Sequence, residues 1–298
     1  MDNPLLALLD LWSRRYIFRG TAPVTQPTLP ATIVTGASEG IGLAIARRFA
    51  QAGNRVVLVA RRETELNAAA EAIKRDFGVD AVALAIDIND RDAGERIETA
   101  LLARGLHADI FVNNAGFGLS GNFAAEPEAD VEALISCNVA ALTRLSRHFL
   151  PGMLSRGQGG LINLSSLAGF TPGPYQAAYY ASKAYVISLT RAIAYETRGR
   201  GVRVALVAPG PIETAFHARM NAESAFYRLM PAPTPEAVAA ATFRGFRWHR
   251  RLIVPGVSAT ILSVIMRMVP SRLAMPFTAL LLYPWDRTQQ TPYRKKNR

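Results

Sequence analysis

Short apolar segments alternate with amphipathic segments along most of the chain from Ala31 onward. The short segments are apolar at nearly every position, which is typical of parallel strands covered by helices on both faces. The longer segments repeat apolar residues every three or four positions, which predicts helices. The predicted strands are Thr32–Thr35, Arg55–Ala60, Ala81–Ala85, Ile110–Asn113, Leu161–Leu164, Val202–Ala208 and Leu252–Val254. The predicted helices are Ile41–Ala52, Thr64–Phe77, Asp92–Ala103, Val131–Ser155, Ala178–Arg198 and Pro235–Arg244.

This alternation predicts an α/β fold, a doubly wound parallel sheet with right-handed crossovers. The 298 residues are 50% hydrophobic, so one large core accommodates them and a second domain is not required. We expect a single domain over residues 31–255 with two terminal extensions. Residues 1–30 form an amphipathic segment followed by a Pro-rich linker, and residues 256–298 are first apolar and then basic.

Composition narrows the classes of partner. The net charge is +11, but the arginines are scattered through helical patterns, which argues against a nucleic-acid interface. Cys137 is the only cysteine, so an intrachain disulfide is excluded and nothing indicates an oxidising compartment. The four histidines lack metal-ligand spacing, so we expect no metal site. The first residues do not resemble a secretory signal. These features predict a cytoplasmic protein.

A glycine-rich segment, TGASEGIG, follows the first predicted strand directly and opens a helix. Gly36 permits a tight turn, Gly40 lets the backbone approach a pyrophosphate, and Gly42 allows the helix to pack against the sheet. The N–H groups at the start of the helix would then face the anion. An ordinary turn is the alternative, but the position between strand and helix favours a dinucleotide site.

The end of the second strand bears on the choice of cofactor. An NAD-binding site normally has an acidic residue here, whereas this chain has Ala60 followed by Arg61 and Arg62. An arginine can bind a 2′-phosphate through charge-assisted hydrogen bonds, so we predict NADP(H), with NAD(H) as the alternative. Glu39 counts against this choice. At the end of the third strand, Asp87 could accept a hydrogen bond from adenine or cap the segment at Asn89.

Four further motifs follow the glycine-rich segment along the chain: NNAG at 113–116, a serine pair at 165–166, YYASK at 179–183 and PGPIET at 209–214. Together with TGASEGIG, they resemble the short-chain dehydrogenase/reductase family in order and spacing over about residues 31–255. The resemblance implies a Rossmann-like fold and an NAD(P)-dependent oxidoreductase that acts on CH–OH or carbonyl groups. Such an enzyme takes a small-molecule substrate, and reduction by NADPH is the expected direction.

The catalytic residues also make chemical sense on their own. Tyr179 and Lys183 are four residues apart and share a helix face, so the ammonium brings the pKa of the phenol toward neutrality. Tyr180 has no such neighbour. Tyr179 is therefore the expected general acid or base. Ser166, thirteen residues earlier, would hydrogen-bond the substrate oxygen. The resemblance adds Asn138 as a residue that orders a proton-relay water, although it could simply kink its helix.

The remaining predicted cofactor contacts follow from the glycine-rich segment and from the resemblance. The predicted cofactor-binding residues are Thr35, Gly36, Ser38, Gly40, Ile41, Gly42, Arg61, Arg62, Asp87, Ile88, Asn114, Ala115, Gly116, Tyr179, Lys183, Pro209, Gly210, Ile212 and Thr214.

Two other functions stay open. One is an NAD-linked alcohol dehydrogenase working in the oxidative direction, and the other is a non-catalytic dinucleotide sensor.

Two apolar regions bear on the substrate and on partners. The predicted lid, Ala215–Pro233, is rich in aromatic residues and methionines and indicates a large apolar substrate, with simple packing as the alternative. The uncharged stretches Leu252–Met266 and Leu273–Trp285 are too short to span a bilayer, and we expect prolines, Pro276 among them, to break them. We predict peripheral membrane contact there, the alternatives being a homo-oligomer interface or closure of the pocket.

Overall fold

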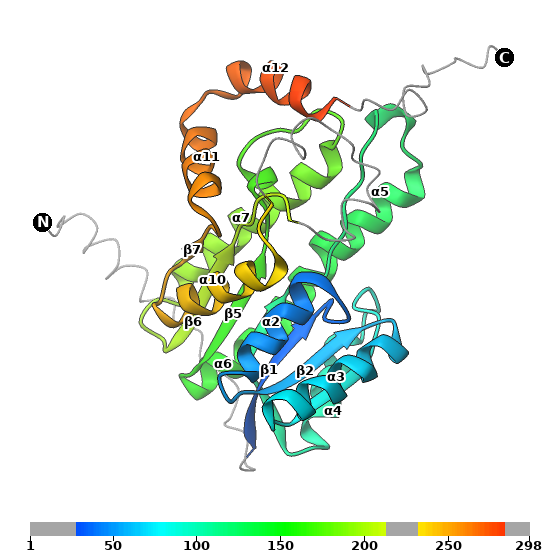
Figure 1. Ribbon diagram of the computed structural model, residues 1–298, viewed down its shortest axis with the longest axis vertical. Coiled ribbons are helices and arrows are strands. Elements are labelled where there is room, and N and C mark those ends of the chain that lie inside the picture. Colours follow the sequence, from blue (N-terminus) through cyan, green and yellow to red (C-terminus); the bar gives the residue numbers. More distant parts are fainter. Residues whose placement is uncertain (1–27, 213–231, 284–298) are drawn as a thin grey trace, which may run out of the picture.

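In the computed structural model, residues 28–212 and 232–283 are described. Seven parallel strands form one sheet in the order β3-β2-β1-β4-β5-β6-β7 (Figure 1). The predicted doubly wound α/β fold is therefore confirmed. The strands are β1 (Leu29–Thr35), β2 (Arg55–Ala60), β3 (Ala81–Ala85), β4 (Leu106–Asn113), β5 (Gly159–Leu164), β6 (Val202–Val207) and β7 (Leu252–Ile253).

Helices cover both faces of the sheet. One core cluster joins the sheet to α2, α3 and α10, and a second joins it to α4 and α6. The α-helices are α2 (Gly40–Ala50), α3 (Glu63–Phe77), α4 (Ala93–Leu102), α5 (Glu128–Ile135), α6 (Leu142–Arg156), α7 (Ala177–Glu196), α10 (Pro235–Arg247), α11 (Val257–Met268) and α12 (Ser271–Leu282). Short 3-10 turns occupy Phe123–Ala125 (η1) and Leu167–Phe170 (η3).

One predicted helix is interrupted. The expected segment Val131–Ser155 consists of α5 and α6 joined by a π-helical stretch, η2 (Ser136–Ala141). A π-helical turn inserts an extra residue, so the side chains before and after it point in directions that a continuous α-helix would not give.

A row of buried polar side chains crosses the centre of the sheet. Asn113 on β4 and Asn163 on β5 are register partners, and the Asn113 amide donates to the Asn163 Oδ1 at 2.9 Å. Asn113 also donates to Ser146 Oγ on α6 at 3.0 Å. On the other side, Asn163 donates to Thr190 Oγ1 on α7 at 3.0 Å. Each of the four residues is at most 3% exposed, so these hydrogen bonds satisfy groups that water does not reach.

The segment after β7 differs from the sequence expectation in one respect. It forms α11 and α12, and α12 continues through Pro276. The expectation that this proline breaks the apolar stretch is therefore wrong. Pro276 has no N–H to bond the carbonyl four residues earlier, so the helix continues with that hydrogen bond missing.

Several predicted features lie outside the described residues. They are the N-terminal amphipathic segment within 1–27, Thr214, most of the predicted lid, and the chain end with Trp285. Within the two described ranges, no helix combines the length and the apolar character needed to cross a membrane.

Candidate active site

A cavity of about 780 Å³ lies beyond the carboxyl ends of the central strands, where doubly wound sheets bind ligands. It extends from the β1–α2 loop, past the ends of β4 and β5, to α7 and α11. Most of the predicted site residues line it, from Gly36 to Ile212. Two described residues do not: Thr35 and Asn138 are buried behind its wall.

The glycine-rich loop has the geometry that its sequence predicts. Gly36 and Gly40 adopt positive φ angles of 65° and 58°, which side-chain-bearing residues rarely tolerate. A Cβ atom on Gly42 would lie 2.2 Å from the carbonyl oxygen of Gly36, so only glycine fits there. Helix α2 begins at Gly40, and its first N–H groups face the cavity end that this loop forms. The loop therefore fits a pyrophosphate.

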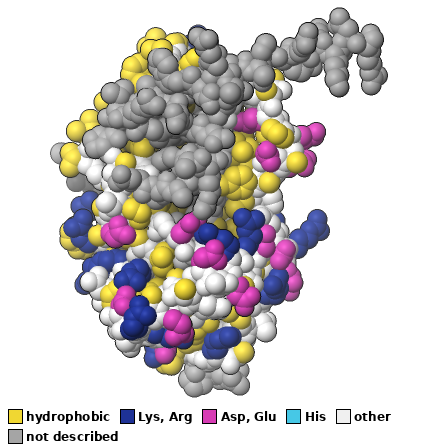
Figure 2. Space-filling view, turned by 45° about the vertical axis from the view of Figure 1, so that its right-hand side comes forward, with side chains coloured by type: hydrophobic (Ala, Val, Ile, Leu, Met, Phe, Trp, Pro, Cys, Tyr) yellow, Lys and Arg dark blue, Asp and Glu magenta, His cyan; other side chains and the backbone are white. Residues whose placement is uncertain are grey.

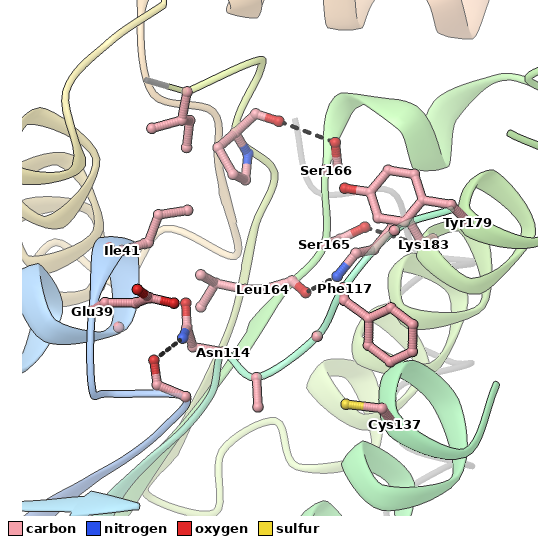
Figure 3. A pocket seen from close by; sticks show the side chains of 18 of the residues that line it. Glu39, Ile41, Asn114, Phe117, Cys137, Leu164, Ser165, Ser166, Tyr179 and Lys183 are labelled. Carbon is pink, nitrogen blue, oxygen red and sulfur yellow. Dashed lines mark hydrogen bonds between the residues drawn. The ribbon is translucent and has the colours of Figure 1, made fainter. Parts of the chain in front are cut away.

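Thr35 and Asn114 hold this loop in place. Thr35 Oγ1 accepts hydrogen bonds from the backbone N–H groups of Asn114 and Ala115 at 3.0 and 3.1 Å. The Asn114 side-chain amide donates to the carbonyls of Thr35 at 2.8 Å and Gly36 at 3.2 Å (Figure 3). These two side chains connect the ends of β1 and β4, so their contribution to a cofactor site is to fix its shape.

The two arginines after β2 have different surroundings. The Arg62 guanidinium pairs with Glu39 at 2.9 Å and Glu65 at 3.4 Å, and it donates to Ser38 Oγ at 3.0 Å. The Arg61 side chain is 76% exposed, and among the described residues its one ion pair is a 4.0 Å approach to Asp87. Arg61 is thus the more available of the two for an anionic ligand. Glu39, which sequence reasoning counted against a phosphate, is neutralised by Arg62.

Asp87 makes the capping contact that the sequence offered, and its hydrogen bond to adenine stays a prediction. Its Oδ1 accepts a hydrogen bond from the backbone N–H of Asn89 at 2.9 Å, which is the capping alternative. Its side chain is nevertheless 36% exposed and lines the cavity together with Ile88. The second carboxylate oxygen therefore remains within reach of a ligand as well as of Arg61.

Tyr179, Lys183 and Ser166 converge at the other end of the cavity. Tyr179 and Lys183 lie one turn apart on α7, and the ammonium is 5.8 Å from the centroid of the phenol ring. Ser166 follows β5, accepts a hydrogen bond from the N–H of Ala168 at 3.2 Å and donates to the carbonyl of Pro209 at 3.4 Å. In Figure 3 the phenol and the serine hydroxyl face the same part of the cavity.

Lys183 is a buried cation with few partners in the described structure. Its ammonium donates to the carbonyl of Leu164 at 3.3 Å, and the residue is 6% exposed. Burial lowers the pKa of Lys183 to about 8. The neighbouring Ser165 is 4% exposed and donates to the Lys183 carbonyl at 2.8 Å, so it braces α7 against β5.

Asn138 lies in the π-helical stretch η2 and braces the wall behind Lys183. Its Oδ1 accepts from the N–H of Phe117 at 3.0 Å, and its Nδ2 donates to the Phe117 carbonyl at 2.8 Å and to Ser182 Oγ at 3.1 Å. A Cβ atom on Gly116 would approach the Asn138 oxygen to 2.8 Å, so the chain passes it closely. The helix irregularity is thus present at Asn138, whereas its role in ordering a proton-relay water stays a prediction.

Cys137, Met266 and Leu282 are among the residues at the site that the sequence did not predict. Cys137 lines the cavity, and burial raises the pKa of its thiol. Met266 of α11 lines the far end, and Leu282 of α12 packs at 1% exposure in a cluster with Tyr179 and Tyr180. The apolar character of the segments after β7 was the available signal, but the sequence does not say where those segments fold back.

Known proteins are similar to this chain in sequence. The family model described as short chain dehydrogenase matches residues 30–225. A short chain dehydrogenase of Pseudocercospora fijiensis is 38% identical over 189 residues, which are 62% of this chain and 60% of that protein. The very-long-chain 3-oxoacyl-CoA reductase of Anas platyrhynchos is 32% identical over 242 residues, 80% of this chain and 74% of that protein.

Solved structures agree with these sequence matches. A short-chain dehydrogenase from Sphingobium yanoikuyae, solved in complex with NADPH, superposes with a TM-score of 0.71 at 29% identity. The superposition covers 81% of this chain and 96% of that one.

Proposed function

The chain belongs to the short-chain dehydrogenase/reductase family of oxidoreductases, and on that premise we propose that it reduces a carbonyl group on a hydrophobic substrate with NADPH. The observation that carries the proposal is the convergence of Tyr179, Lys183 and Ser166 in the cavity whose other end is the glycine-rich loop. One continuous cavity thus offers a dinucleotide site and a proton donor.

The choice of NADPH rests on the end of β2. No acidic residue stands at Ala60 to bind a ribose 2′-hydroxyl, and the exposed Arg61 is available for a 2′-phosphate. The NADPH complex of the Sphingobium relative supports the same choice. In the proposed complex, the α2 N-terminus holds the pyrophosphate and the segment Pro209–Ile212 borders the nicotinamide end.

The chain's own residues supply alignment and a proton, while the bound NADPH supplies the hydride. Ser166 donates a hydrogen bond to the carbonyl oxygen and stabilises the negative charge that develops there. Tyr179 donates its phenolic proton to that oxygen. The Lys183 ammonium stabilises the resulting phenolate, and Asn138 positions the backbone beside Lys183 through its bonds to Phe117.

The substrate end of the cavity is apolar. Phe117, Leu119 and Met266 line it, and Leu282 packs against the tyrosine pair behind it. The resemblance to a very-long-chain 3-oxoacyl-CoA reductase supports an acyl chain as the hydrophobic part of the substrate. We therefore include 3-oxoacyl thioesters among the substrates to be tested first.

The test is a cofactor titration followed by a carbonyl panel. NADPH binding is followed by cofactor fluorescence, and turnover by the loss of reduced-cofactor absorbance with ketones and 3-oxoacyl thioesters of increasing chain length. We expect NADPH to outperform NADH and kcat/KM to rise with chain length. Equal or better use of NADH, with preferred oxidation of alcohols, would favour the NAD-linked dehydrogenase. Binding without turnover of any substrate would favour the sensor.

Arg61→Ala is expected to raise the Kd of NADPH by about ten- to a hundredfold and to leave the Kd of NADH nearly unchanged. The reason is the loss of charge-assisted hydrogen bonds to the 2′-phosphate, which contribute about 1.5–3 kcal/mol. The measurement is a fluorescence titration of both cofactors. An equal loss for the two cofactors would contradict the role of Arg61.

Arg62→Ala is the matched comparison for Arg61→Ala. It removes the neighbouring arginine and, with it, the ion pair between Arg62 and Glu39. This variant is expected to weaken NADPH binding, because the Glu39 carboxylate near the phosphate loses its 2.9 Å ion pair with Arg62. The double variant Arg62→Ala/Glu39→Gln should then recover most of the affinity. If it did not, Arg62 would contact the phosphate directly.

The proposal also includes a cytoplasmic, membrane-peripheral homo-oligomer. An apolar depression between α5 and α7, lined by Phe123, Val131, Ile135 and Val139, supports a contact with a second copy. Exposed apolar surface of this kind is typical of subunit interfaces.

A further inference from the structure

Helix α11 presents apolar side chains to solvent and small ones to the protein. Val257, Ile261, Val264 and Met268 recur at helical spacing and are 79%, 57%, 42% and 77% exposed. The inward positions include Ala259 and Ser263, at 5% and 1%. A helix on the surface of a globular protein normally turns its apolar stripe inward, so this orientation is reversed.

Helix α12 repeats the pattern. Leu273, Phe277 and Leu280 are spaced by four and three residues, share one face, and are 71%, 64% and 68% exposed. Its buried side chains include Thr278 and Leu282. Most of the exposed large hydrophobic side chains in the described part of the chain lie within residues 257–283, which makes this a concentrated surface. We refer to the two outward stripes together as the α11–α12 surface.

The α11–α12 surface stands apart from the charged body of the protein. In Figure 1 both helices lie at the end of the molecule away from β2 and α3, and α12 forms its outer edge. Figure 2 shows side chains of both charges over the lower half of that face, and hydrophobic side chains along its upper left edge. Such separation orients a protein at a boundary between water and an apolar phase.

The charged residues of this segment are all positive. Between Glu236 and Asp286 the sequence has no acidic residue. Arg272 lies between the two stripes at the start of α12, whereas Arg267 donates to the Ser263 carbonyl at 2.8 Å and lies over the Phe170 ring. In a twofold contact with a second copy, this segment would supply no carboxylate to neutralise Arg272. An anionic lipid surface accepts both the apolar stripes and this arginine.

We propose that the α11–α12 surface docks the protein on an anionic lipid membrane, with the mouth of the substrate cavity beside the lipid. The same two helices contribute Met266 to the cavity and Leu282 to the cluster around Tyr179. A hydrophobic carbonyl substrate thus passes between bilayer and cavity with little exposure to water. This second part rests on the proposed function, whereas the docking itself does not.

Flotation of the full chain with vesicles of equal parts phosphatidylcholine and phosphatidylglycerol tests the docking. We expect the protein to float at low salt, less so at high salt, and weakly with phosphatidylcholine alone. Leu273→Glu/Leu280→Glu should lower the partition coefficient by about a hundredfold. Leu102→Glu, at a 51% exposed leucine ending α4, is the matched control and should float like the parent.

Other outcomes overturn the proposal. Docking is wrong if the parent chain stays unbound at low salt, or if the double variant floats unchanged. It is also wrong if the parent is an oligomer in light scattering that the double variant splits, because a second copy then covers the surface. Circular dichroism checks the fold of the double variant. If the double variant misfolds, the milder change Arg272→Glu replaces it, and this change should still weaken binding to the anionic vesicles.

Turnover separates this proposal from the proposed function. The double variant should retain kcat/KM for a short, water-soluble ketone and lose it for a long-chain ketone supplied in vesicles. A chain that floats but reduces no carbonyl contradicts the proposed function alone. A chain that reduces carbonyls but does not float contradicts the docking alone.

Discussion

Tyr179→Phe is expected to lower kcat for carbonyl reduction by about two to four orders of magnitude, with little change in the Kd of NADPH. The phenol is the proposed proton donor, and general acid catalysis contributes rate factors of about this size. The ring itself is 7% exposed and packs beside Tyr180, so phenylalanine preserves the packing. Steady-state kinetics and a fluorescence titration measure the two quantities.

Tyr180→Phe is the control for this prediction, because both tyrosines are buried on the same helix and both line the cavity. Tyr180 packs against Gly173 and has no lysine one turn later, so its loss should change kcat by less than about threefold. If Tyr180→Phe were the crippling change and Tyr179→Phe were mild, the assignment of the proton donor would be wrong.

Lys183→Met is expected to abolish reduction and to stabilise the cofactor-free protein at neutral pH. The charge that the proposed mechanism uses is buried against one carbonyl oxygen, and burial lowers its pKa from 10.5 to about 8. A shift of that size corresponds to destabilisation of about 3 kcal/mol when the lysine is charged. Methionine fills a similar volume without the charge, so thermal unfolding should occur several degrees higher.

The pH dependence of this stability difference has a definite sign. Below about pH 8, Lys183 is charged in both the folded and the unfolded chain, so the full cost of burying the charge is present. Between about pH 8 and 10.5 the folded state gives up its proton first, and the cost decreases as pH rises. The advantage of Lys183→Met in unfolding temperature should therefore be larger at pH 7 than at pH 10.

Lys74→Met supplies the comparison for the stability measurement. Lys74 is exposed on α3 and pairs with Glu71 at 2.7 Å, and surface pairs of this kind contribute about 0–1 kcal/mol. Its replacement should leave the unfolding temperature nearly unchanged at both pH values. If Lys183→Met proved less stable than the parent at pH 7, packing of the lysine stem would outweigh the desolvation of its charge.

The sheet and the glycine-rich loop after β1 could be predicted because the sequence patterns that indicate them are local. Buried parallel strands are continuously apolar, and the spacing of Gly36, Gly40 and Gly42 expresses a steric requirement inside one turn. The i, i+4 relation of Tyr179 and Lys183 is likewise fixed by the helix that contains both. Each of these patterns refers to residues within a few positions of one another.

Features that depend on distant residues could not be predicted in the same way. The π-helical stretch at Asn138 follows from its hydrogen bonds to Phe117, twenty-one residues earlier in the chain. The pairing of Arg62 with Glu39 needs the β1–α2 and β2–α3 loops to be adjacent. The position of Leu282 beside the tyrosines requires α12 to fold back over the cavity, and no periodicity within α12 specifies that contact.

The polar row across the sheet has a consequence for how precisely the site is assembled. Asn113 donates a hydrogen bond to Asn163 only when β4 and β5 are aligned as they are. A slip by one residue would leave four buried polar side chains without these hydrogen bonds. These buried hydrogen bonds therefore disfavour any other alignment of β4 and β5. Asn114 and Ser165 begin the loops that follow these two strands, and both loops line the cavity. The alignment of β4 and β5 therefore fixes the positions of the two loops relative to each other before a ligand binds.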